Sequence, residues 1–172
     1  MSWIRRLISL LIVVVAAIVI PAVYYAFAWL TDRILALPPL PPAPLNGYLF
    51  LSALSVLVGL FWIFWAYSYI LFVGRGSPVE VLWLALLPTE QLVTTGPYAY
   101  TRNPMFLGLL FMLLAAALYG RSITALVLLP LAAVAGIEYL RVNEEPRLRE
   151  RFGREYSQYR RSVPALIPRP RR

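Results

Sequence analysis

The sequence predicts an all-α integral membrane protein with about four transmembrane helices. Three observations support this fold class. The 172 residues are 60% hydrophobic, with a mean hydropathy of +0.70. The apolar residues gather in four runs, each close to the roughly 20 residues that a spanning helix needs. Ten of the 16 arginines lie from Arg141 onward, so positive charge is concentrated at one end of the chain.

We expect each of the four apolar runs to form one span. The runs comprise residues 7–30, 47–73, 104–119 and 123–140. The first follows two arginines and ends in aromatic residues, which is typical of a spanning helix. A cleaved signal peptide is the competing interpretation of this run, because Ala26-Phe27-Ala28 resembles a cleavage site. The run is long for a signal peptide, so we favour a span.

Two segments lie outside these runs. Residues 74–95 are polar and irregular, and their apolar middle, residues 81–87, is too short to cross a bilayer. We therefore expect a cytoplasmic segment there that is re-entrant or interfacial. After the fourth run comes a charged helical tail to about residue 161, followed by an extended apolar stretch. The chain thus divides into an N-terminal pair of spans, residues 1–73, and a second unit, residues 74–172.

The arginines also predict the orientation of the chain. In a four-span topology, all of them except Arg33 and Arg121 fall on one side of the membrane. Because cytoplasmic loops carry an excess of basic residues, we expect a multi-pass cell-membrane protein with both termini in the cytoplasm.

The residue types that are missing limit the chemistry. The chain contains no cysteine and no histidine, which excludes thiol catalysis, histidine bases and the usual zinc sites, and we predict no metal site. A basic tail is compatible with nucleic acid, but beside a membrane helix a surface facing lipid headgroups is the better interpretation. We therefore expect no nucleic-acid partner.

The most informative stretch runs from Gly96 to Gly108, where a turn leads into the third apolar run. Asn103 and Pro104 have the residue types of a helix N-cap and first helical position. The N–H groups at such a helix start are suited to an anion, and Arg102 stands beside them. The sequence thus predicts a polar site at the N-terminal end of the third span.

Charged residues near the end of the fourth span form a second group. Glu138, Arg141 and Glu145 are spaced to share one face of a helix, whereas Glu144 falls on another side. Such groups are costly within a membrane, so they should face the bundle interior and pair with one another. A salt-bridge ladder that only ends the helix explains the same pattern and stays open.

Taken together, these motifs resemble the isoprenylcysteine carboxyl methyltransferase family and the related membrane phospholipid methyltransferases. The resemblance covers about residues 74–168 and rests on the order and spacing of several pieces. These pieces are Gly96-Pro97-Tyr98, Arg102-Asn103-Pro104-Met105-Phe106-Leu107-Gly108, Glu144-Glu145, Phe152-Gly153, Tyr156, Tyr159 and Val163-Pro164. Residues 74–172 are then a methyltransferase-like core.

The resemblance implies a helical membrane enzyme that binds S-adenosylmethionine in a cytoplasm-facing pocket and takes a lipid-like or prenylated acceptor from the bilayer. It implies that Arg141 faces the methyl acceptor. The chemistry of methyl transfer adds Arg102 and Glu138 as candidates for catalysis. The cofactor-binding residues that the resemblance implies are Leu92, Val93, Gly96, Tyr98, Asn103, Pro104, Met105, Phe106, Glu144 and Glu145.

This sequence departs from the family pattern at two places. Asn103 stands where the family commonly has histidine, which keeps a helix cap and removes a titratable ring. Phe106 stands where prenylcysteine enzymes usually have tyrosine, which removes a hydroxyl. Both changes are compatible with cofactor binding and weigh against a prenylcysteine acceptor.

The sequence leaves the acceptor open between two chemical classes. A carboxylate is already a nucleophile and needs an arginine to orient it, and either Arg141 or Arg102 meets that need. An amine must lose a proton and needs a nearby carboxylate such as Glu138. We slightly favour carboxyl O-methylation of a prenylcysteine-type substrate over N-methylation of a phospholipid amine. An NADPH-dependent sterol-type reductase and a non-enzymatic membrane scaffold are the other hypotheses.

Overall fold

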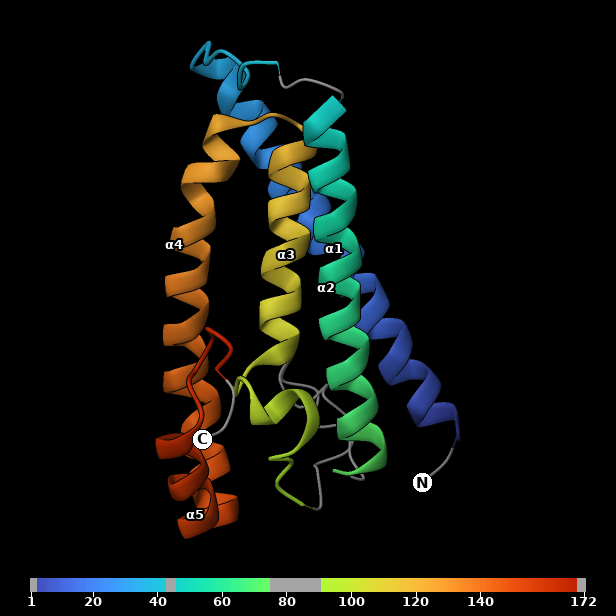
Figure 1. The fold of residues 1–172 in the computed structure, drawn as a ribbon, viewed down its shortest axis with the longest axis vertical. Coiled ribbons are helices and arrows are strands. Elements are labelled where there is room, and N and C mark those ends of the chain that lie inside the picture. Colours follow the sequence, from blue (N-terminus) through green and yellow to red (C-terminus); the bar gives the residue numbers. More distant parts are fainter. Residues whose placement is uncertain (1–2, 43–45, 75–90, 170–172) are drawn as a thin grey trace.

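The computed structural model describes residues 3–42, 46–74 and 91–169, and every regular element in those ranges is helical (Figure 1). The predicted all-α fold is thereby confirmed. The long helices are α1 (Trp3–Ile34), α2 (Gly47–Phe72), α3 (Pro104–Tyr119) and α4 (Ile123–Tyr139). A short 3-10 helix, η3 (Gly96–Ala99), precedes α3. A π-helical turn, η4 (Leu140–Glu144), joins α4 to the tail helix α5 (Glu145–Ser162).

Among the described residues, three helical stretches are long and apolar enough to cross a membrane: Arg6–Ile34, Gly47–Phe72 and Ile123–Ser162. The last runs from α4 through η4 into α5, and α5 is kinked at Gly153, whose backbone is not helical. The third predicted span, α3, is a shorter apolar helix of 16 residues. The observed helices overlap all four predicted apolar runs. The predicted re-entrant or interfacial segment, residues 81–87, lies outside the described residues.

The tightest packing in the bundle is between α2 and α3, where two glycines face each other. A Cβ atom on Gly108 would lie 2.7 Å from the Gly59 carbonyl oxygen, and one on Gly59 would lie 2.8 Å from that of Gly108. Ser52 on α2 also donates a hydrogen bond of 2.9 Å to the Ala115 carbonyl of α3. Small residues and hydroxyls let helix backbones approach closely inside a membrane. This contact fixes the start of α3 beside α2.

Polar contacts join α1 to α4 at the end of the bundle that lies away from η3. The Asp32 carboxylate accepts hydrogen bonds from the Ser122 hydroxyl and from the Thr124 backbone and hydroxyl. Ser122 in turn caps α4 by accepting a bond of 3.0 Å from the Ala125 N–H. The polar groups in this connection therefore satisfy one another and hold the first turn of α4.

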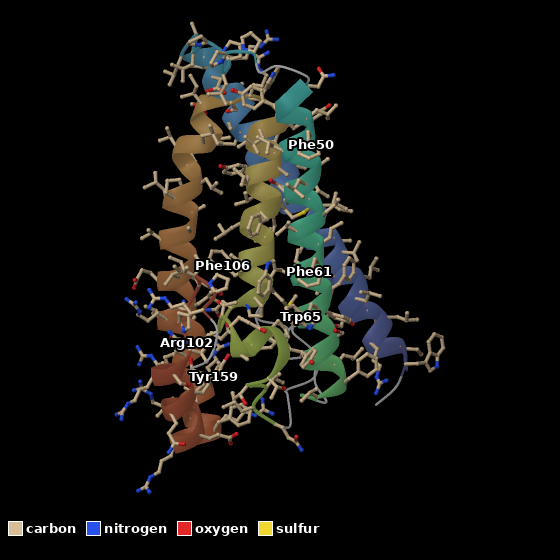
Figure 2. The ribbon with its side chains drawn as sticks, in the orientation of Figure 1. Phe50, Phe61, Trp65, Arg102, Phe106 and Tyr159 are labelled. Atoms are coloured by element: carbon tan, nitrogen blue, oxygen red, sulfur yellow. The ribbon has the colours of Figure 1, made fainter. Side chains whose placement is uncertain are left out.

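The other end of the bundle carries the sequence motifs that predict a site. Here η3, the start of α3, η4 and α5 lie together, and both chain termini lie toward this end (Figure 1). Arg102 and Tyr159, which are far apart in sequence, lie near each other in this region (Figure 2). The fold thus brings the turn before α3 against the continuation of α4.

We expect Gly108→Ala to destabilise the protein even though alanine favours a helix over glycine by about 1 kcal/mol. The new methyl group would collide with the Gly59 carbonyl, and overpacking of this kind costs about 1–3 kcal/mol. Thermal unfolding in detergent measures the effect. Leu57→Ala is the control, because Leu57 is an exposed residue on α2. Equal melting temperatures for Gly108→Ala and the parent would contradict this account of the packing.

Candidate active site

The turn before α3 is held by contacts other than the cap that its sequence predicts. Asn103 occupies the N-cap position and Pro104 follows it in the first turn, as expected, but the Asn103 side chain does not cap α3. Its amide donates a hydrogen bond of 2.9 Å to the Ala165 carbonyl, beyond α5. The expected side-chain cap is therefore wrong: the bond from Asn103 Nδ2 turns the side chain toward the tail, and its oxygen accepts no hydrogen bond from the first N–H groups of α3.

Helix α5 packs beneath this turn through its aromatic residues. Tyr156, Tyr159 and Val163 are buried, and Leu92, Tyr98, Leu148 and Phe152 pack around them. The Tyr159 hydroxyl donates a hydrogen bond of 2.7 Å to the Tyr98 carbonyl. These tail aromatics were not among the predicted site residues, although their spacing within a charged helix marks an apolar face.

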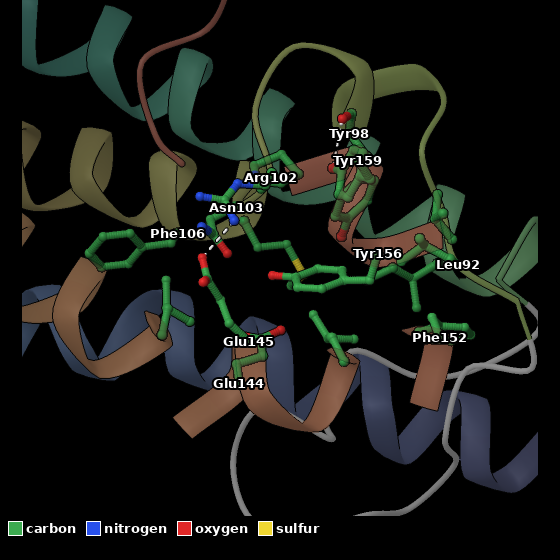
Figure 3. Close-up of a pocket in the computed structure, with 16 residues that line it drawn as sticks. Leu92, Tyr98, Arg102, Asn103, Phe106, Glu144, Glu145, Phe152, Tyr156 and Tyr159 are labelled. Atoms are coloured by element: carbon green, nitrogen blue, oxygen red, sulfur yellow. Dashed lines mark hydrogen bonds and ion pairs between the residues drawn. The ribbon is translucent and has the colours of Figure 1, made fainter. Parts of the chain in front are cut away.

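A pocket of about 150 Å³ lies between the turn, the first residues of α3 and the tail (Figure 3). This volume is roughly ten times what one water molecule occupies by the same measure. Its lining residues are Ile70, Leu92, Val93, Tyr98, Arg102, Asn103, Pro104, Met105, Phe106, Leu140, Glu144, Glu145, Leu148, Phe152, Tyr156 and Tyr159.

The structure places all the sequence-predicted cofactor-binding residues except Gly96 on this pocket. Gly96 instead shapes the turn: it has a φ of 59°, and the Tyr69 ring lies against it so closely that a Cβ atom would collide. Glu144 lines the pocket together with Glu145 even though an ideal helix puts the two on different sides. Ile70, Leu140 and Leu148 were not predicted, since isolated apolar residues carry no sequence signal for a site. Phe152 belongs to the motifs of the resemblance but was not predicted to line the site.

Of the three predicted catalytic residues, only Arg102 lines the pocket. Glu138 and Arg141 pair with each other at 2.7 Å on the surface, where their side chains are 53% and 54% exposed. The prediction that they share one face with Glu145 is wrong. The π-helical turn η4 intervenes, and each extra residue rotates the rest of the helix by about 100° around its axis.

Arg102 and Glu145 form the ion pair that closes the pocket. Arg102 Nη1 lies 2.6 Å from Glu145 Oε1, and only 12% and 13% of the two side chains are exposed. The second carboxylate oxygen of Glu145 lies 2.9 Å from Nε of Arg160. The Arg102 Nε atom is buried and has no hydrogen-bond partner among the described residues. One carboxylate thus connects the turn before α3 to both ends of the tail helix.

Tyr98 lines the pocket with an uncharged side chain. Burial raises the pKa of its phenol well above the usual value, and the nearby Glu144 and Tyr159 raise it further. The phenol therefore keeps its proton throughout the physiological pH range and does not serve as a base. Its ring contributes to the lining of the pocket.

Phe106 connects the pocket to α4. Its ring lies against Gly136, where a Cβ atom would come within 2.1 Å of the ring. Phe106 also lines the pocket, so one side chain of α3 contacts both the pocket and α4.

The fold and the pocket define a helical membrane protein with a polar, aromatic site near one end of its bundle. Residues 48–155 match the model of the phospholipid methyltransferase family. The match covers more than half of the chain, so the chain belongs to this family, which includes isoprenylcysteine carboxyl methyltransferase-like proteins. The resemblance seen in the sequence is thereby confirmed.

Family membership supports a membrane methyltransferase that acts on lipid-like substrates. The reductase and scaffold hypotheses receive no such support. Searches of curated proteins and of solved structures found no significant match.

We expect Glu145→Gln to destabilise the protein and Glu138→Gln to leave it nearly unchanged. The first change removes the counter-charge of Arg102 and Arg160 where little solvent is present, which costs about 2–4 kcal/mol. The second removes an exposed pair that contributes at most about 0.5 kcal/mol. Chemical or thermal unfolding of both variants in one detergent provides the comparison, and equal losses would contradict the assigned roles.

Proposed function

We propose that this protein transfers a methyl group from S-adenosylmethionine to a lipid-borne acceptor, and that the pocket between α3 and the tail binds the cofactor. The observation that carries the proposal is that Tyr98 and Glu145 line one cavity. These residues come from the two motif groups that the family resemblance joins. Had the fold placed them apart, the motifs would not define a site.

The residues of the pocket fit the cofactor's chemical groups. The rings of Tyr98, Tyr156 and Phe152 offer stacking surfaces for an adenine and negative faces for a sulfonium. The start of α3 and Arg102, whose Nε–H has no partner in the part of the chain that the structure describes, are suited to the methionine carboxylate. The Glu145 carboxylate is suited to the cofactor's ammonium or hydroxyl groups.

The chain contributes binding, orientation and exclusion of water. When bound, S-adenosylmethionine would supply a methyl group on a sulfonium, which is transferred by direct displacement. Positioning is the main requirement of such a step, so a site without histidine is sufficient. Phe106 and the tail aromatics shield the pocket, and the Arg102–Glu145 pair fixes its polar end.

The charges of the pocket favour an amine acceptor over a carboxylate. Arg141, expected from the sequence to orient a carboxylate, lies outside the pocket. Arg102 pairs with Glu145, and its remaining donors are suited to the cofactor's carboxylate, which leaves no arginine among the described lining residues for a carboxylate acceptor. Glu144 and Glu145 would repel an anionic acceptor. Glu138 also lies outside, so we propose Glu144 as the group that takes the proton an ammonium acceptor must lose before its nitrogen attacks.

We also propose that the pocket end of the bundle faces the cytoplasm of a cell-membrane protein. The tail at this end carries most of the arginines, in agreement with the excess of basic residues on the cytoplasmic side. A lipid acceptor would then reach the pocket from the adjoining leaflet.

We expect the purified protein in detergent to bind S-adenosylmethionine and not NADPH, as measured by calorimetry. Tyr98→Ala should weaken binding at least tenfold, because it removes a ring from the wall of the pocket. Tyr119→Ala is the matched control, since Tyr119 is exposed at the opposite end of α3. Binding of NADPH alone would refute the proposal, as would equal affinity in both variants and the parent.

The chemical nature of the methylated product shows whether the acceptor is an amine or a carboxylate. With methyl-labelled cofactor, we expect label on phosphatidylethanolamine in vesicles, stable to mild base, and a rate that falls at least tenfold in Glu144→Gln. A prenylcysteine acceptor would instead give a methyl ester that releases labelled methanol in base. That result would refute the amine proposal while leaving methyl transfer intact.

A further inference from the structure

The residues that follow α5 lie against the turn beside the pocket. Residues Val163–Arg169, which we call the C-terminal strap, run back from α5 to the turn between η3 and α3 (Figure 1). Val163 is only 3% exposed and packs with the buried tyrosines of α5. The strap is therefore anchored at its beginning before it reaches the turn.

Four hydrogen bonds attach the strap to the turn. The Arg102 N–H donates to the Pro164 carbonyl at 2.9 Å, and the Arg169 N–H donates to the Tyr100 carbonyl at 3.0 Å. The Ala165 carbonyl accepts from the Thr101 hydroxyl at 3.2 Å and from the Asn103 amide at 2.9 Å. Successive residues of the turn are thus held by the strap.

Thr101 is the centre of this attachment. It is fully buried and does not line the pocket, whereas its neighbours Arg102 and Asn103 do. Its hydroxyl donates to the strap and also accepts a bond of 3.3 Å from the Asn103 N–H. One hydroxyl therefore connects the strap to Asn103, the residue just before α3.

The contacts of α5 hold other parts of the site. Tyr159 holds the Tyr98 carbonyl and Arg160 holds Glu145. The Arg102 N–H and the Asn103 amide, by contrast, both donate to carbonyls of the strap. The strap thus constrains the backbone from which the Arg102 side chain reaches Glu145.

We infer that the C-terminal strap is a positioning element of the pocket and that Thr101 is a positioning residue, acting on the ligand through Arg102 and Asn103. The inference rests on the proposed function for its effect on the cofactor, because a ligand binds less well when its partners must be ordered on binding. Its structural part, that the strap orders the turn, stands without any ligand.

The test compares Thr101→Val, which keeps the shape and removes the hydroxyl, with Thr101→Ser, which keeps the hydroxyl. Loss of the hydroxyl's two hydrogen bonds should weaken S-adenosylmethionine binding about fivefold to tenfold, and serine should restore most of it. Ser157→Ala is the control, because it removes a hydroxyl-to-carbonyl bond that lies wholly within α5. In turnover assays the change should appear in KM for the cofactor more than in kcat.

A second measurement needs no ligand. Hydrogen–deuterium exchange of the peptide containing residues 98–106 should be faster in Thr101→Val, and faster still in a chain that ends after Val163, while peptides from α2 stay unchanged. If the strap acts through Thr101, adding Thr101→Val to the shortened chain should have little further effect.

The outcomes separate the two proposals. Unchanged exchange and unchanged affinity in Thr101→Val would overturn the inference while leaving the proposed function intact. Faster exchange in Thr101→Val, when the parent protein binds no S-adenosylmethionine, would refute the proposed function and support the strap's ordering role. Equal losses in Thr101→Val and Thr101→Ser would show that shape rather than the hydroxyl matters, and would overturn the role of Thr101.

Discussion

The ion pair between Arg102 and Glu145 is the interaction on which the site depends. It joins the turn that starts α3 to the helix that continues α4, across 43 positions of sequence. Both side chains are largely removed from solvent, so neither charge is stable there without the other. Around this pair, aromatic residues of the tail close the pocket from below. The Tyr159 hydroxyl and the C-terminal strap join the same two motif groups by hydrogen bonds, and the Arg102–Glu145 pair is the charged contact among them.

The helix packing supplies the rigidity that this pair requires. Gly59 and Gly108 bring α2 and α3 into backbone contact, which fixes the level at which α3 begins. At the opposite end, Asp32 holds the start of α4. Between these fixed points, the π-helical turn η4 changes the register of the helix just before Glu145. Such turns are frequent at functional sites, and here one directs both glutamates to the pocket.

Much of this arrangement was predictable from the sequence. The four apolar runs became helices because their length and composition leave little alternative in a membrane. Pro104 marked the start of α3, and the motif order located most of the pocket wall. The failures have local causes: Arg141 and Glu138 were misplaced because ideal helical spacing does not include a π turn. The side chain of Asn103 was misassigned because its NH2 group donates to a carbonyl 62 positions away, which orients the side chain toward the tail.

The central claim is that the start of α3 and the helical segments that continue α4 form one cofactor pocket. Photocrosslinking tests this claim most directly. A photoreactive S-adenosylmethionine analogue, bound to the parent protein and mapped by mass spectrometry, should label peptides from both residues 92–106 and residues 144–159. Excess S-adenosylmethionine should prevent the labelling of both. Competed labelling confined to one of these segments, or found elsewhere in the bundle, would contradict the account.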